Sequence, residues 1–111
     1  MAIVNMTAMV NFYTQVFELN FEPVEMFGTQ LFKTKWGSFN VLFCPASLAG
    51  NNAQQNRHQL DIYVDDLDNS INKVVSYGGQ LMGEVSETDL EKSIGIIDPD
   101  QNTMVLKSLK N

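Results

Sequence analysis

The sequence is poor in cysteine and has no long apolar run. Cys44 is the only cysteine among 111 residues, so no disulfide can form within the chain. The apolar runs are all too short to span a bilayer, and the first residues lack the basic flank and long apolar stretch of a secretory signal. We therefore expect a cytoplasmic protein without a membrane partner.

Basic residues are also scarce. Seven Lys and Arg stand against thirteen Asp and Glu, which gives a net charge of −6. This balance argues against a nucleic-acid backbone or an anionic membrane surface as a partner, and it tolerates a cationic guest better. A chain of 111 residues suffices for one domain, so we expect residues 1–111 to form a single domain.

One local pattern occurs twice, around Asn5 and, 61 positions later, around Asp66. In each copy the end of an apolar strand leads into a side chain that can cap a helix, and then into an amphipathic helix. A polar, proline-containing connection over residues 44–57 separates the two copies. The chain therefore divides into a first unit of about residues 1–46 and a second of about residues 57–111.

Each unit has the predicted order βαβββ. Apolar stripes at helical spacing predict helices over residues 7–18 and 67–77, and Gly78-Gly79 is expected to end the second. Two such units, related by a pseudo-twofold axis, can curl around a shared space. We expect an α+β fold in which an eight-stranded mixed sheet forms a cup with the two helices outside. The predicted strands are residues 2–5, 21–25, 30–36, 38–43, 59–64, 80–85, 92–97 and 103–109.

These patterns resemble the vicinal oxygen chelate superfamily, which includes glyoxalases, extradiol dioxygenases and bleomycin-resistance proteins. The resemblance covers almost the whole chain, and it implies a cup that holds a small molecule. It also implies a homodimer, in which units are sometimes exchanged between chains. The segments that carry it are Ile3-Val4-Asn5-Met6, Phe12-Tyr13, Val16-Phe17, Val64-Asp65-Asp66-Leu67-Asp68, Tyr77-Gly78-Gly79 and Asp98-Pro99-Asp100-Gln101-Asn102.

The resemblance also implies four positions for ligands of a divalent metal. The first would fall ahead of Met1, and the others fall near Phe43, at Gln59 and at Val105. Only Gln59 offers a donor atom, whereas a divalent ion needs three or four protein donors. We therefore expect no metal and no other cofactor.

The strand that begins near Gln59 presents two different faces. Leu60, Ile62 and Val64 share the phase expected to pack on the helix, so Gln59, Asp61 and Tyr63 should face the cavity. His58 shares the helix-facing phase, and a bulge would be needed to turn it inward. Asp61 and Tyr63, about 7 Å apart, could touch one ligand or act in catalysis. The alternative is that Asp61 is solvated or paired with Lys33, Lys35 or Lys107.

Aromatic residues mark consecutive strands of the first unit. Alternation places Phe32 and Trp36 on one face, and Phe39 and Phe43 on one face of the next strand. They would line the cup with flat apolar surface, or else pack in the core against the first helix. The predicted ligand-binding residues are Phe32, Trp36, Phe39, Phe43, Gln59, Asp61, Tyr63 and Val105.

The leading hypothesis is a bleomycin-resistance-like protein that binds a small cationic or aromatic ligand without a metal and without catalysis. One alternative is a metal-dependent enzyme similar to lactoylglutathione lyase or to a dioxygenase. Another is a metal-free isomerase that uses Asp61 and Tyr63. A third is an interaction module whose cup is filled by its own side chains.

Overall fold

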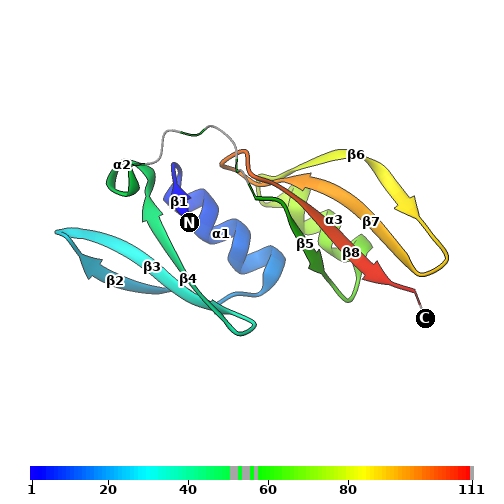
Figure 1. The fold of residues 1–111 in the computed structure, drawn as a ribbon, viewed down its shortest axis with the longest axis horizontal. Helices are drawn as coiled ribbons and strands as arrows, with labels where there is room; N and C mark the ends of the chain where they lie inside the picture. The colour runs from blue at the N-terminus through cyan, green and yellow to red at the C-terminus, as the bar shows by residue number, and fades with distance from the viewer. Residues whose placement is uncertain (51–52, 54–55, 57, 111) are drawn as a thin grey trace.

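The structure is a computed structural model that describes residues 1–50, 53, 56 and 58–110 (Figure 1). It confirms the α+β class and the repeated βαβββ order. The first unit contains β1 (Ala2–Ile3), α1 (Met6–Phe17), β2 (Glu22–Met26), β3 (Thr29–Trp36), β4 (Phe39–Pro45) and α2 (Ala46–Ala49). The second contains β5 (Leu60–Tyr63), α3 (Leu67–Ser76), β6 (Gln80–Glu87), β7 (Glu91–Ile97) and β8 (Thr103–Leu109).

The eight strands form two four-stranded mixed sheets with the same internal order, β1-β4-β3-β2 and β5-β8-β7-β6. In each sheet the strand before the helix pairs in parallel with the last strand of its unit, and the other pairs are antiparallel. Neither sheet closes into a barrel, and the two lie at opposite ends of a molecule 50 Å long (Figure 1). Within the described ranges, no helix is long and apolar enough to cross a membrane.

Both long helices begin at the side chains that the repeat predicts. Asn5 Oδ1 accepts a hydrogen bond from the Ala8 amide at 3.2 Å, and Asp66 Oδ1 accepts one from the Asn69 amide at 3.1 Å. Each bond satisfies an amide that the first helical turn leaves unpaired. The two units therefore share the type of helix cap as well as the strand order.

One short helix was not predicted. In the segment predicted as a connection, residues 44 and 45 end β4, and the four residues of α2 follow them. The next residue, Gly50, is in a left-handed conformation with φ 68°. A proline at the start and a glycine at the end are common signals for a helix. Four residues are too few to show helical periodicity, which is why the pattern along the sequence missed it.

The two units share one apolar core. Helix α1 contacts α3, and α3 contacts β6, β7 and β8. Gly79, just after α3, allows this approach, because a Cβ atom there would lie 2.7 Å from the Phe12 ring of α1. The buried cluster draws on both units: Ile3, Met9, Phe12, Tyr13, Val16, Leu19, Phe43, Leu67, Val74, Ile94, Ile96, Met104 and Leu106.

The turn between β7 and β8 ties the second unit to the first. The Asp98 carboxylate, 1% exposed, accepts a hydrogen bond from the Tyr13 hydroxyl of α1 at 2.9 Å and further bonds from Asp100 and Asn102 of its own turn. The Asp100 carboxylate accepts bonds from the amides of Val4 and Asn5 at 2.6 and 2.9 Å. Together these contacts hold the start of α1 against the β7–β8 turn.

Burial shifts both partners of the Tyr13–Asp98 bond in the same direction. It raises the pKa of the Tyr13 phenol well above its ordinary value, and the charge of Asp98 raises it further. Burial also raises the pKa of the Asp98 carboxyl, although the hydrogen bonds from Asn102 and Tyr13 oppose that rise. At neutral pH the phenol therefore stays protonated and remains a donor.

The outer edges of both sheets carry features that hinder pairing with another strand. In β2 the edge residue Pro23 has no amide hydrogen to donate. In β6 the pairing with β7 shifts between Met82 and Ser86, where Gly83 has φ 83°. Such a bulge twists an edge away from regular pairing. Neither outer edge is therefore well suited to regular pairing with a further strand.

Candidate functional site

The second sheet has one face covered by α3 and one face left open. Directly paired residues lie on the same face, so the pairs Ile62 with Leu106 and Ile94 with Leu106 belong to the buried side. The pairs of Asp61 with Val105 and of Tyr63 with Lys107 therefore lie on the other side. We call this side the open face, and its residues include Asp61, Tyr63, Met82, Glu91, Ser93, Gly95, Val105, Lys107 and Leu109.

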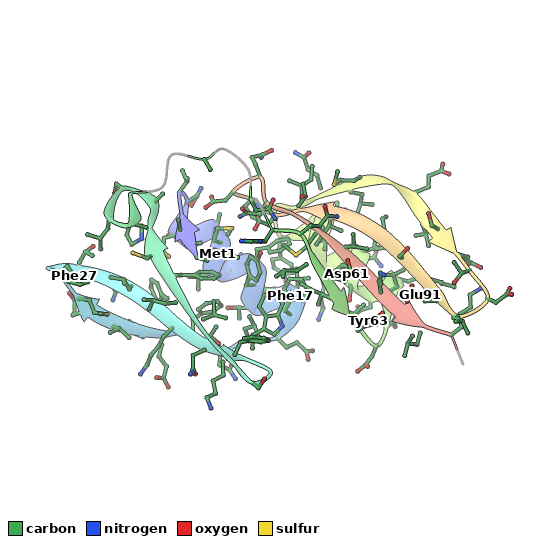
Figure 2. All side chains as sticks on the ribbon, viewed as in Figure 1. Met1, Phe17, Phe27, Asp61, Tyr63 and Glu91 are labelled. Carbon is green, nitrogen blue, oxygen red and sulfur yellow. The ribbon has the colours of Figure 1, made fainter. Side chains whose placement is uncertain are left out.

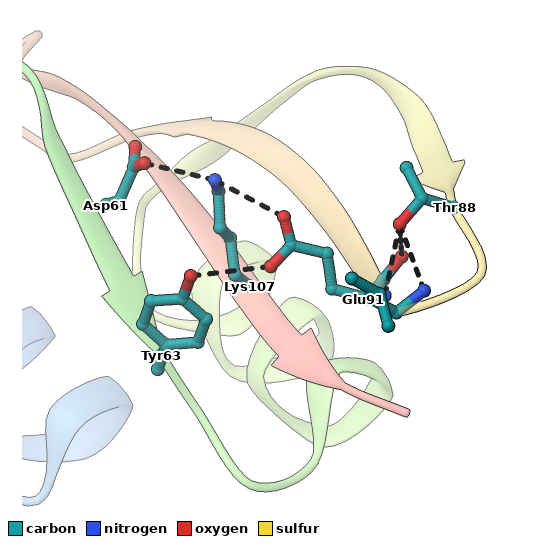
Figure 3. A network of polar contacts seen from close by, with 6 residues as sticks. Asp61, Tyr63, Thr88, Glu91 and Lys107 are labelled. Atoms are coloured by element: carbon teal, nitrogen blue, oxygen red, sulfur yellow. Dashed lines mark hydrogen bonds and ion pairs between the residues drawn. The ribbon is translucent and has the colours of Figure 1, made fainter. Parts of the chain in front are cut away.

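A polar network runs across the open face (Figure 3). Lys107 Nζ lies 3.1 Å from Asp61 Oδ2 and 3.5 Å from Glu91 Oε1. The other oxygen of Glu91 accepts a hydrogen bond of 3.4 Å from the Tyr63 hydroxyl. Residues from β5, β7 and β8 are thus joined by one ammonium group and one phenol. Asp61 is paired with Lys107, which is one of the three lysines that the sequence offered as its partner.

The network has one more negative charge than positive. Lys107 is the only cation in it, and the hydrogen bond to Asp61 raises the pKa of its ammonium, so it stays charged at neutral pH. The side chain of Asp61 is 52% exposed, whereas that of Glu91 is 25% exposed. A molecule arriving from solvent therefore meets the carboxylate of Asp61 more readily than that of Glu91.

The second unit also carries most of the charge of the protein. Ten of the thirteen acidic residues and five of the seven basic ones lie in residues 57–111, which gives this unit −5 of the total −6. Figure 2 shows Asp61, Tyr63 and Glu91 on this half of the molecule, whereas Phe27 of the first unit lies at the opposite end. The field around the open face thus favours cations.

Three other predicted residues lie near β5 and β8. Gln59 is exposed immediately before β5, and Val105 is half-buried on the open face opposite Asp61. His58 is exposed in the bend before β5 and lines a cleft of about 1440 Å³ between the two units. A second cleft, of about 710 Å³, lies on the first unit beside Lys33 and Lys35. Neither of these two clefts includes Asp61 or Tyr63.

The predicted aromatic residues occupy a different place from the open face. Phe43 is 1% exposed, and its ring lies 5.4 Å from that of Tyr13 in α1. Trp36 packs against Phe17, with 4.9 Å between ring centroids, and Phe32 is partly buried against the same core. The core-packing alternative therefore describes Phe32, Trp36 and Phe43, none of which lines either of the two clefts described above. Phe39 is 75% exposed at the β3–β4 turn.

The residues at the implied metal positions do not suit a divalent ion. Phe43 is buried in the core, Val105 has no donor atom, and Gln59 alone offers an amide oxygen. On the open face the ammonium of Lys107 already bridges the carboxylates of Asp61 and Glu91. Among the described residues, no group of three or more His, Cys, Asp or Glu could hold a metal ion. No chemical step is therefore assigned to a metal here.

A family model described as a glyoxalase-like domain matches residues 2–106. The chain belongs to this glyoxalase-like family. Its place in the vicinal oxygen chelate superfamily, which the sequence motifs indicate, is thereby confirmed. A search of curated proteins finds no match to the chain.

Solved structures show the same fold at low sequence identity. A glyoxalase/bleomycin resistance protein/dioxygenase family enzyme from Burkholderia phytofirmans is 18% identical, with a TM-score of 0.74 over 99% of this chain and 94% of its own. The fosfomycin resistance protein FosX from Mesorhizobium loti is 16% identical, with a TM-score of 0.71 over 96% and 85%. TnmS3, an antibiotic binding protein from a Streptomyces species, is 12% identical, with a TM-score of 0.69 over 98% and 90%.

Two members of the network were missed in the sequence. Lys107 was considered only as one of three possible partners for Asp61, and Glu91 was not considered at all. The signal that could have found them is the parallel pairing of β5 with β8, which places Tyr63 beside Lys107, together with alternation along β7. Pairing between strands distant in sequence cannot be deduced from the pattern of one strand.

Proposed function

We propose that this glyoxalase-like protein binds a small cationic or aromatic molecule on the open face of its second sheet, without a metal. The observation that carries the proposal is the network of Asp61, Tyr63, Glu91 and Lys107, which offers excess negative charge on an uncovered surface. Tyr63 is 58% exposed, so its ring can stack on a flat guest. The printed description of TnmS3 as an antibiotic binding protein supports a binding role for this fold.

We further propose that the site is completed in a homodimer. The open face bears exposed apolar side chains, among them Met82 at 48% and Leu109 at 66%, beside the charged network. An apolar surface of this kind is commonly covered by a partner. Sedimentation equilibrium should give a mass twice the 12.5 kDa of the chain, and a mass of 12.5 kDa at all concentrations would contradict the dimer. The single Cys44 agrees with the cytoplasm as the proposed compartment.

A thermal-shift screen of aromatic amines, aromatic carboxylates and neutral aromatics tests the binding proposal. A guest at about a hundred times its dissociation constant should stabilise the fold by about 2.7 kcal/mol and raise Tm by roughly 10 °C. The shift should shrink in Asp61→Asn and Tyr63→Ala. It should persist in two matched controls, Asp89→Asn in the β6–β7 turn and Phe39→Ala on the first unit, both of which are exposed.

If no compound raises Tm, the proposed binding function fails. If a shift is seen but is the same in all four variants, the open face is not the binding site. A separate measurement tests the metal-free state, namely the metal content of protein purified without chelator. Stoichiometric nickel, zinc, iron or manganese would contradict that part of the proposal and would favour the metal-dependent lyase or dioxygenase.

A further inference from the structure

The two carboxylates that share Lys107 hold it unequally. Asp61 is the nearer partner, at 3.1 Å against 3.5 Å, but its side chain is half exposed and has no second bond to the network. Glu91 is more buried and is also fixed by the Tyr63 hydroxyl. If the ion pair with Asp61 breaks, Lys107 still has Glu91 as a carboxylate partner. Asp61, in contrast, has no cation in the network other than Lys107.

The ammonium of Lys107 occupies the position that the charge of a cationic guest would take. It satisfies the exposed carboxylate of Asp61, which is the group of the network that solvent reaches most easily. The side chain of Asp61 is 52% exposed and that of Lys107 is 22% exposed, so water reaches the carboxylate and weakens its pair with the ammonium. A guest that brings its own ammonium or amidinium can thus replace the lysine at Asp61 without leaving a buried charge unpaired.

Tyr63 favours a guest that carries a flat ring beside its positive charge. It lies two residues along β5 on the same face as Asp61, so the two side chains are about 7 Å apart. Its ring is largely exposed, and its hydroxyl is held by Glu91 (Figure 3). A held ring offers a fixed surface for stacking. A benzene ring that carries a cationic group spans this distance, since an amidinium carbon lies about 3 Å from the ring centre and its hydrogen bond adds about 3 Å.

We propose that Lys107 is a built-in competitor for aromatic compounds that carry an alkylammonium or amidinium group, which displace its ammonium from Asp61, stack on Tyr63 and leave Lys107 paired with Glu91. This inference rests on the proposed binding function and names the class of guest. It assigns Lys107 a role opposite to that of a contact residue. Removing the lysine should improve binding of a cation, whereas removing a contact residue would weaken it.

The test uses 4-aminobenzamidine as the probe and calorimetric titration as the measurement. Lys107→Met keeps the apolar stem and removes the charge, and it should tighten binding by about two- to fivefold. Asp61→Asn should weaken binding by at least about tenfold. In the double variant the gain from Lys107→Met should disappear, because no carboxylate is left at position 61 to be released.

Lys92→Met is the matched control. Lys92 lies on β7 of the same sheet and pairs with Glu87 instead of Asp61, so its loss changes the net charge equally without freeing the proposed site. Lys107→Gln provides a second variant if Lys107→Met proves poorly folded by circular dichroism. The neutral isostere 4-aminobenzamide should bind all variants with nearly equal affinity.

Three results would overturn the competitor role. One is weaker binding of 4-aminobenzamidine in Lys107→Met and Lys107→Gln, which would make the lysine a contact residue. Another is an equal gain in Lys92→Met, which would reduce the effect to net charge. The third is no binding of this probe while other compounds shift Tm through Asp61 and Tyr63, which would leave the binding function standing with a different guest. Failure of the whole thermal-shift screen would instead remove the binding function itself.

Discussion

The two units have the same strand order but place their chemistry on opposite sides of the sheet. In the first unit the rings of Tyr13, Phe17, Trp36 and Phe43 gather between α1 and its sheet, inside the core. In the second unit the buried side of the sheet is aliphatic, and the phenol of Tyr63 lies outside it with a charged network. One repeated fold thus supports packing in the first half and a polar surface in the second.

Replacement of a ring in each unit should give the largest contrast. Phe43→Ala opens a cavity in the core and should lower the free energy of unfolding by about 3 to 5 kcal/mol. Tyr63→Ala removes an exposed ring and should cost well under about 1 kcal/mol. Urea denaturation followed by circular dichroism measures both. Equal losses would contradict the placement of the Tyr63 ring on an exposed surface of the chain.

Alkaline pH should reveal the contribution of the buried phenol of Tyr13. Because the pKa of Tyr13 is raised in the folded state, the unfolded chain releases this proton first, near the ordinary pKa of about 10. The stability that this group contributes is therefore present below about pH 10 and is lost as pH rises beyond it, by at most about 1.4 kcal/mol per pH unit.

Denaturation curves between about pH 9 and about pH 11 measure this loss. Tyr13→Phe should be less stable than the parent chain at neutral pH, since Asp98 loses a donor, but it should decline less steeply above about pH 10. Tyr63→Phe is the control and should decline as the parent does. A Tyr13→Phe curve parallel to that of the parent would contradict the assignment.

The helix caps, which occur in both units, should give the smallest difference in stability between the units. Asn5→Ala and Asp66→Ala each remove one cap of a long helix and should each cost about 1 kcal/mol, because each leaves one amide of the first turn without its side-chain partner. Urea denaturation is again the measurement. If one substitution lowers the free energy of unfolding by more than about twice as much as the other, the two helix caps are not energetically equivalent.

The helix caps and the strand order could be predicted because they depend on local sequence patterns. Asn5 and Asp66 precede regular apolar stripes, and Asp98 to Asn102 is a compact turn between two strands. Strand β8, Thr103–Leu109, was predicted with the observed bounds. These features depend on residues within a few positions of one another.

The face toward which a strand points could not be decided in the same way. Alternation correctly groups Phe32 with Trp36, but it does not say which group meets the helix, and an aromatic ring suits a core and a cavity equally well. The outcome depends on Tyr13 and Phe17 of α1, which offer partner rings on the helix side. In the same way, the Lys107–Glu91 contact depends on β8 lying between β5 and β7.

The close contact between Gly79 and the Phe12 ring bears on whether either unit can fold without the other. Neither half has a complete hydrophobic interior of its own, because each fills the other. If the chain were cut between α2 and β5, the two fragments should remain unstructured when separate and regain a folded state on mixing. Such complementation would show directly that the two units share one hydrophobic interior.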